Sequence, residues 1–120
     1  MLVGIDDKMK EELAGLYTEC KQILYAAPDD GKCSDNEAEV YADFENLAES
    51  IKYAGDIISE ENPEKKPVVD IPLELKKMHK KLKSILNEAP DEDICTNEEN
   101  DIFANIANLI DSLKNANFLK

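Results

Sequence analysis

Apolar residues recur along four stretches of the chain at alternating steps of three and four residues, with polar residues between them. This spacing places one apolar stripe along each of four helices, with the period expected for bundle packing. The four stripes are Met9, Leu13, Leu16, Cys20, Ile23 and Ala27; Val40, Phe44, Leu47, Ile51, Ala54 and Ile58; Ile71, Leu75, Met78, Leu82, Ile85 and Ala89; and Ile102, Ile106, Leu109, Leu113 and Ala116. Flanking apolar residues such as Tyr17, Phe103 and Ile110 widen the stripes, so each helix should pack against two neighbours.

Prolines mark several boundaries of these helices. Pro28 and Pro90 follow the first and third stripes, and proline disfavours the helical conformation in the residue before it. Pro63 and Pro67 lie within residues 61–70, which we interpret as the linker. Pro72 suits the first turn of the third helix.

Capping boxes mark the starts of the second and fourth helices. Ser34 precedes Glu37 by three residues, and Thr96 precedes Glu99 by the same spacing. In such a box the hydroxyl accepts a backbone N–H, and the glutamate accepts the N–H of the capping residue.

The two capping boxes belong to an internal repeat, because residues 21–54 and 83–116 align without gaps and place Cys33 on Cys95. We assign repeat 1 to about residues 9–60 and repeat 2 to about residues 71–118, within one domain of residues 1–120. Each repeat is a helical hairpin that cannot bury its stripes alone. The sequence therefore predicts an all-α, antiparallel up-down four-helix bundle built from two tandem repeated hairpins. In that topology both hairpin loops share one end, and the second and fourth helices lie on a diagonal.

The formal net charge is −13, and all fourteen basic residues are lysines. Such a surface repels nucleic acid and anionic lipid, and it suits a basic protein partner or simply solubility. No apolar run is long enough to cross a bilayer, and the first residues lack the features of a signal peptide. The odd number of cysteines, three, favours a reducing compartment, so we expect the cytoplasm.

Carboxylates concentrate in and beside the two hairpin loops, whereas Lys76, Lys77, Lys80, Lys81 and Lys83 make the third helix basic. These lysines could balance acids on neighbouring helices. If both loops share one end, that end forms a strongly negative pole able to bind a basic partner. The predicted partner-binding residues are Asp29, Asp30, Asp35, Glu37, Asp91, Glu92, Asp93, Glu98, Glu99 and Asp101.

Candidate metal and catalytic sites find little support. Gly31 and Glu37 fit an EF-hand loop, but Ala26 and Pro28 stand where it needs carboxylates. His79, the one histidine, lacks the Glu-x-x-His context of di-iron bundles and the Lys-Gly that follows the histidine of phosphotransfer domains. We expect it at the rim of the core. We predict no enzyme activity and no cofactor.

The cysteines leave several alternatives open. Cys20 lies on the first stripe and is expected to behave as a small buried hydrophobe. Cys33 and Cys95 could pack the loops against the helix starts, pair as a disulfide or act as reactive thiols.

The functional hypothesis is a non-catalytic acidic binding protein, monomeric or weakly dimeric. It would be an inhibitor of the immunity-protein or nucleic-acid-mimic type, whose basic partner is a nuclease or nucleic-acid-binding protein. One alternative is a structural or oligomerising adaptor, favoured by the wide apolar band of the fourth helix. The other is a weak divalent-metal binder.

Overall fold

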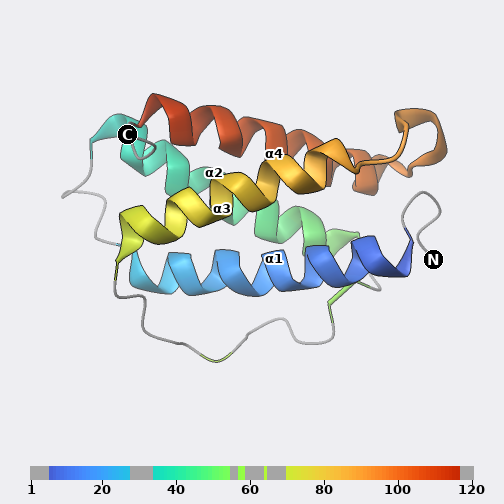
Figure 1. Cartoon of the computed structure of the whole chain (residues 1–120), viewed down its shortest axis with the longest axis horizontal. Helices are drawn as coiled ribbons and strands as arrows, with labels where there is room; N and C mark the ends of the chain where they lie inside the picture. The colour runs from blue at the N-terminus through green and yellow to red at the C-terminus, as the bar shows by residue number, and fades with distance from the viewer. Residues whose placement is uncertain (1–5, 28–33, 55–56, 59–63, 65–69, 117–120) are drawn as a thin grey trace.

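The computed structural model describes residues 6–27, 34–54, 57–58, 64 and 70–116. Their regular structure is entirely helical (Figure 1). The elements are α1 (Asp7–Ala26), α2 (Asp35–Tyr53), α3 (Ile71–Asn87), the 3-10 turn η2 (Glu92–Ile94) and α4 (Asn97–Asn115). Among the described residues, no helix combines the length and the apolar character that a membrane-spanning segment requires.

Side chains satisfy backbone N–H groups at the start of every α-helix. The predicted capping boxes at Ser34 and Thr96 are both confirmed, each with its two reciprocal hydrogen bonds. Asp6 and Asp70 cap α1 and α3, where their carboxylates accept the backbone N–H groups of Met9 at 2.8 Å and Leu73 at 3.2 Å. Pro72 lies in the first turn of α3, as predicted.

The predicted stripes form one core, which is confirmed along the middle of every helix. Stripe residues at the helix ends, such as Ala54 and Ile71, are half-buried. The buried members are Met9, Leu13, Leu16, Cys20 and Ile23; Val40, Phe44, Leu47 and Ile51; Leu75, Met78, Leu82 and Ile85; and Ile102, Ile106, Leu109 and Leu113. At about 1.5–3 kcal/mol for each large apolar side chain, burial of these residues is the main source of stability.

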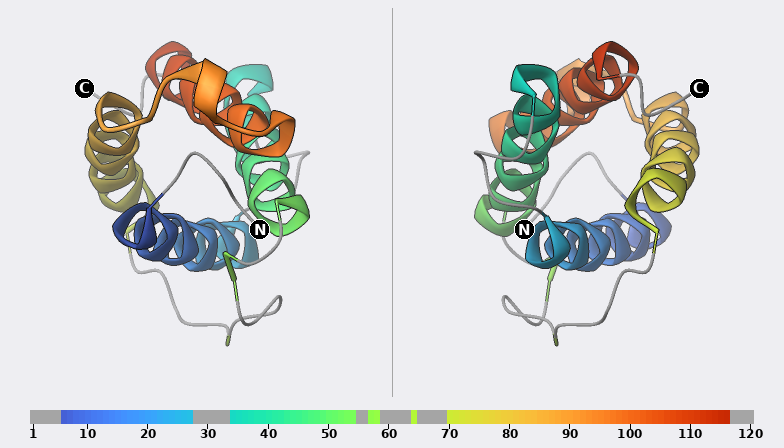
Figure 2. Two further views of the ribbon diagram at one scale, coloured as in Figure 1. Left: turned by 90° about the vertical axis from the view of Figure 1, so that its right-hand side faces the viewer. Right: turned by 90° about the vertical axis from the view of Figure 1, so that its left-hand side faces the viewer.

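The helices do not surround this core in the expected order. Viewed end on, α1 has α2 and α3 as neighbours, and α4 completes the ring between α2 and α3 (Figure 2). Among the described helices, the most extensive contact joins α2 to α4. The prediction that these two helices lie on a diagonal is therefore wrong; the diagonals are α1 with α4 and α2 with α3.

The helix directions also differ from an up-down bundle. In Figure 1, α1 and α4 run from right to left, whereas α2 and α3 run from left to right. The antiparallel pairing of α2 with α4 is fixed by hydrogen bonds, since Asn36 donates to the carbonyl of Asn115 at 3.3 Å and Asn105 donates to the hydroxyl of Ser50. Every neighbouring pair is thus antiparallel, but consecutive α2 and α3 are parallel, and the up-down prediction is wrong.

This arrangement places the end of α1 and the start of α2 at one end of the molecule, and the connection between α3 and α4 at the other. The end that we call the α3–α4 end contains the connection between α3 and α4, the start of α1 and the end of α2 (Figure 2, left). The other end, the α1–α2 end, contains the starts of α2 and α3 and the end of α4 (Figure 2, right).

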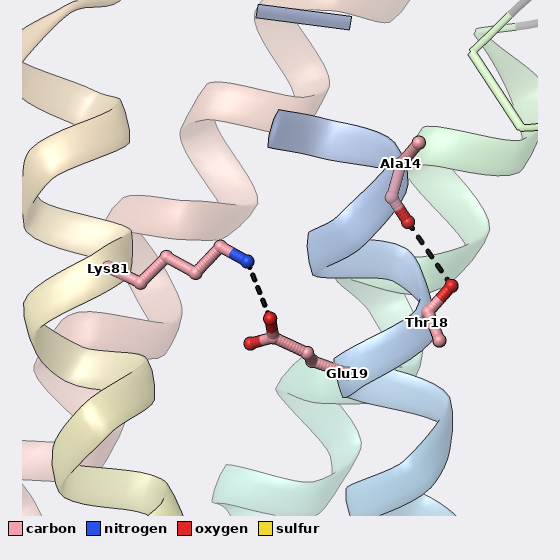
Figure 3. A network of polar contacts seen from close by, with 4 residues as sticks. All are labelled: Ala14, Thr18, Glu19 and Lys81. Carbon is pink, nitrogen blue, oxygen red and sulfur yellow. Dashed lines mark hydrogen bonds and ion pairs between the residues drawn. The ribbon is translucent and has the colours of Figure 1, made fainter. Parts of the chain in front are cut away.

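Polar contacts tie the hairpins together across the bundle. The Lys81 ammonium of α3 lies 2.6 Å from the Glu19 carboxylate of α1 (Figure 3). Between α2 and α4, the Ser112 hydroxyl donates to the Asp43 carboxylate. Both contacts join one hairpin to the other, so they favour this docking of the two hairpins over a slipped one.

Candidate protein-binding surface

The ten carboxylates predicted to form one pole are separated by the fold. Asp35 and Glu37 begin α2 at the α1–α2 end, whereas the residues from Asp91 to Asp101 belong to the α3–α4 end. Asp29 and Asp30 lie outside the described residues. The expectation of a single acidic pole made from both loops is wrong, because the second hairpin docks with its connection at the opposite end.

Two of these carboxylates are engaged in capping. Glu37 accepts the backbone N–H of Ser34 at 3.1 Å, and Glu99 accepts that of Thr96 at 2.7 Å. The hydrogen bonds from the backbone and side chain of Ser34 lower the pKa of Glu37. Glu99 is fully buried, with an exposed fraction of 0%. Its assignment as a contact residue is therefore corrected, because no partner can reach a side chain enclosed within the bundle.

The α3–α4 end gathers more carboxylates than the second loop alone supplies. Its exposed members are Asp6, Asp7, Glu88, Asp91, Asp93, Glu98 and Asp101. Glu92 begins η2 in the same connection. Sequence reasoning missed Asp6 and Asp7, because the up-down topology placed the start of α1 at the other end. They could have been identified only if the direction of the second hairpin had been predicted correctly, because that direction decides which end the start of α1 shares with the α3–α4 connection.

Among the described residues, ion pairing with lysine compensates little of the charge at this end. Lys8 lies 3.9 Å from Glu88, with 72% and 46% of the two side chains exposed. Such an open pair is worth little. Helix dipoles account for another part of the acidity, since Asp6 and Asp7 begin α1 and Glu98 begins α4. Asp91 and Asp93 precede the first turn of α4, so their charges exceed what capping requires.

Two large apolar side chains are exposed at the same end. Tyr53, the last residue of α2, is 72% exposed, and Ile94, the last residue of η2, is 55% exposed. The hydrogen bond between Asn105 and Ser50 brings the last turn of α2 beside the first half of α4. A tyrosine and an isoleucine among carboxylates form the kind of mixed surface that proteins use as contact points.

The basic face of α3 was a second feature of the sequence. Lys81 pairs with Glu19 of α1, which agrees with the balancing interpretation, whereas Lys77 pairs at 3.6 Å with Glu74 of its own helix. Leu73 is 47% exposed and borders a hollow of about 490 Å³, whose other described lining residues are Lys76, Lys77, His79 and Lys80.

His79 lies half-buried on that face, in agreement with its expected place at the rim of the core. Its Nε2 atom is buried and accepts no hydrogen bond from the described part of the chain. Burial, and then Lys83 and Lys114, lower the pKa of the imidazole. An enclosed nitrogen does not suit phosphotransfer, which needs an accessible one.

Two of the three cysteines, Cys20 and Cys95, lie in the described part of the chain. Cys20 is fully buried, as predicted, and burial raises the pKa of its thiol, which keeps it protonated. Cys95 is half-buried against the core, whereas Cys33 lies outside the described residues. Within the described ranges, no three His, Cys, Asp or Glu side chains are grouped as a metal ion would require.

The apolar band of α4, which favoured an adaptor role, is turned into the bundle. Ile102, Ile106, Leu109 and Leu113 are 0% exposed, and Phe103 and Ile110 are less than one-tenth exposed. The chain therefore uses this band for its own core, and the observation that favoured an adaptor no longer points to one.

Comparison of the chain with protein-family models, with curated proteins and with solved structures finds no match.

Proposed function

We propose that this chain is a non-catalytic binding protein that engages a basic surface of another protein through its α3–α4 end. The observation that carries the proposal is the exposure of Tyr53 and Ile94 at the same end of the bundle as Asp91, Asp93 and Asp101, whose charges capping does not require. The carboxylates would attract a cationic partner over distance and raise the association rate. The two apolar side chains would then hold the complex through desolvated contacts.

The best-supported class is an inhibitor of the immunity-protein or nucleic-acid-mimic type. A rigid bundle that presents carboxylates resembles, in charge, the phosphates to which nucleases and nucleic-acid-binding proteins respond. The high net negative charge disfavours direct nucleic-acid or membrane binding. We expect a cytoplasmic monomer or weak dimer without cofactor.

Partner capture at two salt concentrations tests the proposal. The chain would be immobilised in a lysate of its native host, and bound proteins identified at low and high salt. Because surface charges are screened over about 10 Å at 0.1 M salt, the partner should be lost at high salt. A partner retained equally at both concentrations would show that charge is not the basis of binding.

A matched pair of variants then locates the surface. Asp91→Asn, Asp93→Asn and Asp101→Asn together should reduce capture. The control combines Glu39→Gln, Glu45→Gln and Glu49→Gln, which removes the same charge from exposed positions of α2. Equal loss with both triple variants would attribute binding to net charge and would overturn the assignment to the α3–α4 end.

We also propose that the two hairpins arose by duplication of one helical hairpin. The gapless alignment of residues 21–54 with 83–116 supports this origin, as do the matching capping boxes of α2 and α4. The repeat supplies matched control positions, because each residue of α4 has a counterpart in α2.

A further inference from the structure

An apolar groove lies between the end of α3 and the first half of α4. Its volume is about 310 Å³, and its apolar lining is Leu86, Ala89, Pro90, Phe103, Ala104 and Ala107. Phe103 is mostly buried in it, whereas Ala104 is exposed. Because three of these six residues are alanines, the backbone of another segment could approach closely.

Charge around this groove is predominantly negative. Glu88 and Asp91 flank its Ala89–Pro90 wall, Asp101 follows Asn100, the polar lining residue, and Asp111 lies one turn beyond Ala107; all four carboxylates are exposed. The nearest lysine along α3 is Lys83, one turn before Leu86. An occupant would therefore need apolar side chains for the groove and basic ones for its borders.

Among the described residues, the hollow of the first hairpin differs in lining from this groove, although the two sequences align. The counterpart of Ala107 is Glu45, and that of Ala104 is Ala42. The hollow between α1 and α2 is smaller, about 150 Å³, and its lining includes Lys21, Glu45, Glu49 and Lys52. Glu45 therefore places a charge in the first hairpin at the position where the second has Ala107.

We propose that this groove receives an amphipathic helix of the basic partner, with its apolar face on Phe103 and Ala104 and its flanking Lys or Arg side chains toward Asp91, Asp101 and Asp111. Helices bind grooves in this way by placing apolar residues three and four positions apart. The inference rests on the proposed function and adds the form of the partner's binding element.

A displayed library of amphipathic helical peptides, with either Lys or Glu on the flanks, provides the probe. Selection against the wild-type chain should enrich the Lys-flanked members. Ala104→Gln fills the groove without changing its charge. It should lower the affinity of the selected peptides for the chain by about tenfold or more, as loss of a central apolar contact does. Ala42→Gln makes the same change at the exposed counterpart in α2 and should leave affinity unchanged.

Three results would overturn the inference. The first is enrichment of Glu-flanked or uncharged peptides. The second is equal affinity of the selected peptides for wild type and Ala104→Gln. The third is self-association of the wild-type chain in sedimentation that Ala104→Gln abolishes, because the occupant would then be a second copy.

The captured host protein separates this inference from the proposed function. A partner lost with the Asp91, Asp93 and Asp101 variant but kept by Ala104→Gln overturns the groove and leaves the acidic surface in place. A partner kept by that charge variant but lost with Ala104→Gln overturns the proposed electrostatic function and retains the groove as a binding site.

Discussion

Glu37 and Glu99 accept the same capping hydrogen bond at the starts of α2 and α4, but Glu37 is partly exposed and Glu99 is fully buried. One local motif therefore stands in two environments. In α2 the box acts at the surface, where water can replace lost hydrogen bonds. In α4 Thr96 is half-buried and Glu99 lies in the core, so water can replace lost hydrogen bonds less readily.

Removal of each capping hydroxyl should destabilise the protein by about 0.5–2 kcal/mol. We expect Thr96→Ala to cost more than Ser34→Ala, because it removes the acceptor of the Glu99 N–H beside a buried carboxylate. Urea unfolding followed by circular dichroism measures both. Thr18→Ala is the control, since this exposed hydroxyl donates only to the Ala14 carbonyl one turn earlier (Figure 3). An equal loss in the control would exclude capping as the cause.

The capping contribution of Glu37 should depend on pH. Its pKa is lower in the folded chain than the ordinary value of 4.5, so the ionised form stabilises the fold. That stability is present above the unfolded pKa and disappears as the pH falls through the folded pKa. Wild type should therefore exceed Glu37→Gln in urea midpoint at pH 7, and this advantage should vanish in strong acid. Glu39→Gln, at an exposed position outside the capping box, is the control for the loss of one carboxylate.

Truncation of the core leucines should be costly in both hairpins. Leu47 and Leu109 are 0% exposed, so Leu47→Ala and Leu109→Ala should each reduce the free energy of unfolding by about 2–5 kcal/mol through lost burial and a residual cavity. Leu73→Ala, at a position 47% exposed, should cost far less. Comparable losses at all three positions in urea melts would contradict the assigned core.

Gly15→Ala should stabilise the protein by about 0.5–1 kcal/mol, because glycine in a helix interior costs backbone entropy. An added Cβ would lie 3.5 Å from the Lys81 ammonium, which is an ordinary contact with the end of a flexible side chain. Thermal unfolding measures the effect. A lower melting temperature for Gly15→Ala would contradict this expectation. Recovery on adding Lys81→Met would then attribute the loss to the contact between the new methyl group and the Lys81 side chain.

The single imidazole should titrate below its ordinary pKa of 6.5, because burial, Lys83 and Lys114 all oppose its charge. Nuclear magnetic resonance can follow the ring protons of His79 without overlap from another histidine. Because the unfolded chain binds this proton more readily, stability should decline as the pH falls below the unfolded pKa. His79→Gln should reduce that decline. A folded pKa above 6.5 would contradict the enclosed placement of the ring.

The elements that the sequence predicted well depend on local rules. The stripe from Val40 to Ile51 is buried because helix period alone selects one face, and Ser34 and Thr96 cap their helices because their partners lie three residues away. Nothing distant in the chain is needed for either result. Asp91 and Asp101 were proposed in the same way, from composition near a turn; both are exposed, and their role in binding stays a prediction.

The relation between the two hairpins depends on distant contacts, and the sequence prediction of it was wrong. A missed signal is the length of residues 54–70, since neighbouring antiparallel helices usually need only about 2–8 connecting residues. A segment of this length can extend roughly 50 Å. That exceeds the length of a 19-residue helix such as α2, about 28 Å, and permits α3 to begin at the far end.

Because the contact of α2 with α4 is extensive, each hairpin covers the apolar face of the other. Cleavage of the chain between α2 and α3 would leave two hairpins, each with its apolar face exposed to water. We expect that neither fragment would fold independently. Loss of structure in one hairpin should then destabilise the other, and the protein should unfold in a single cooperative transition.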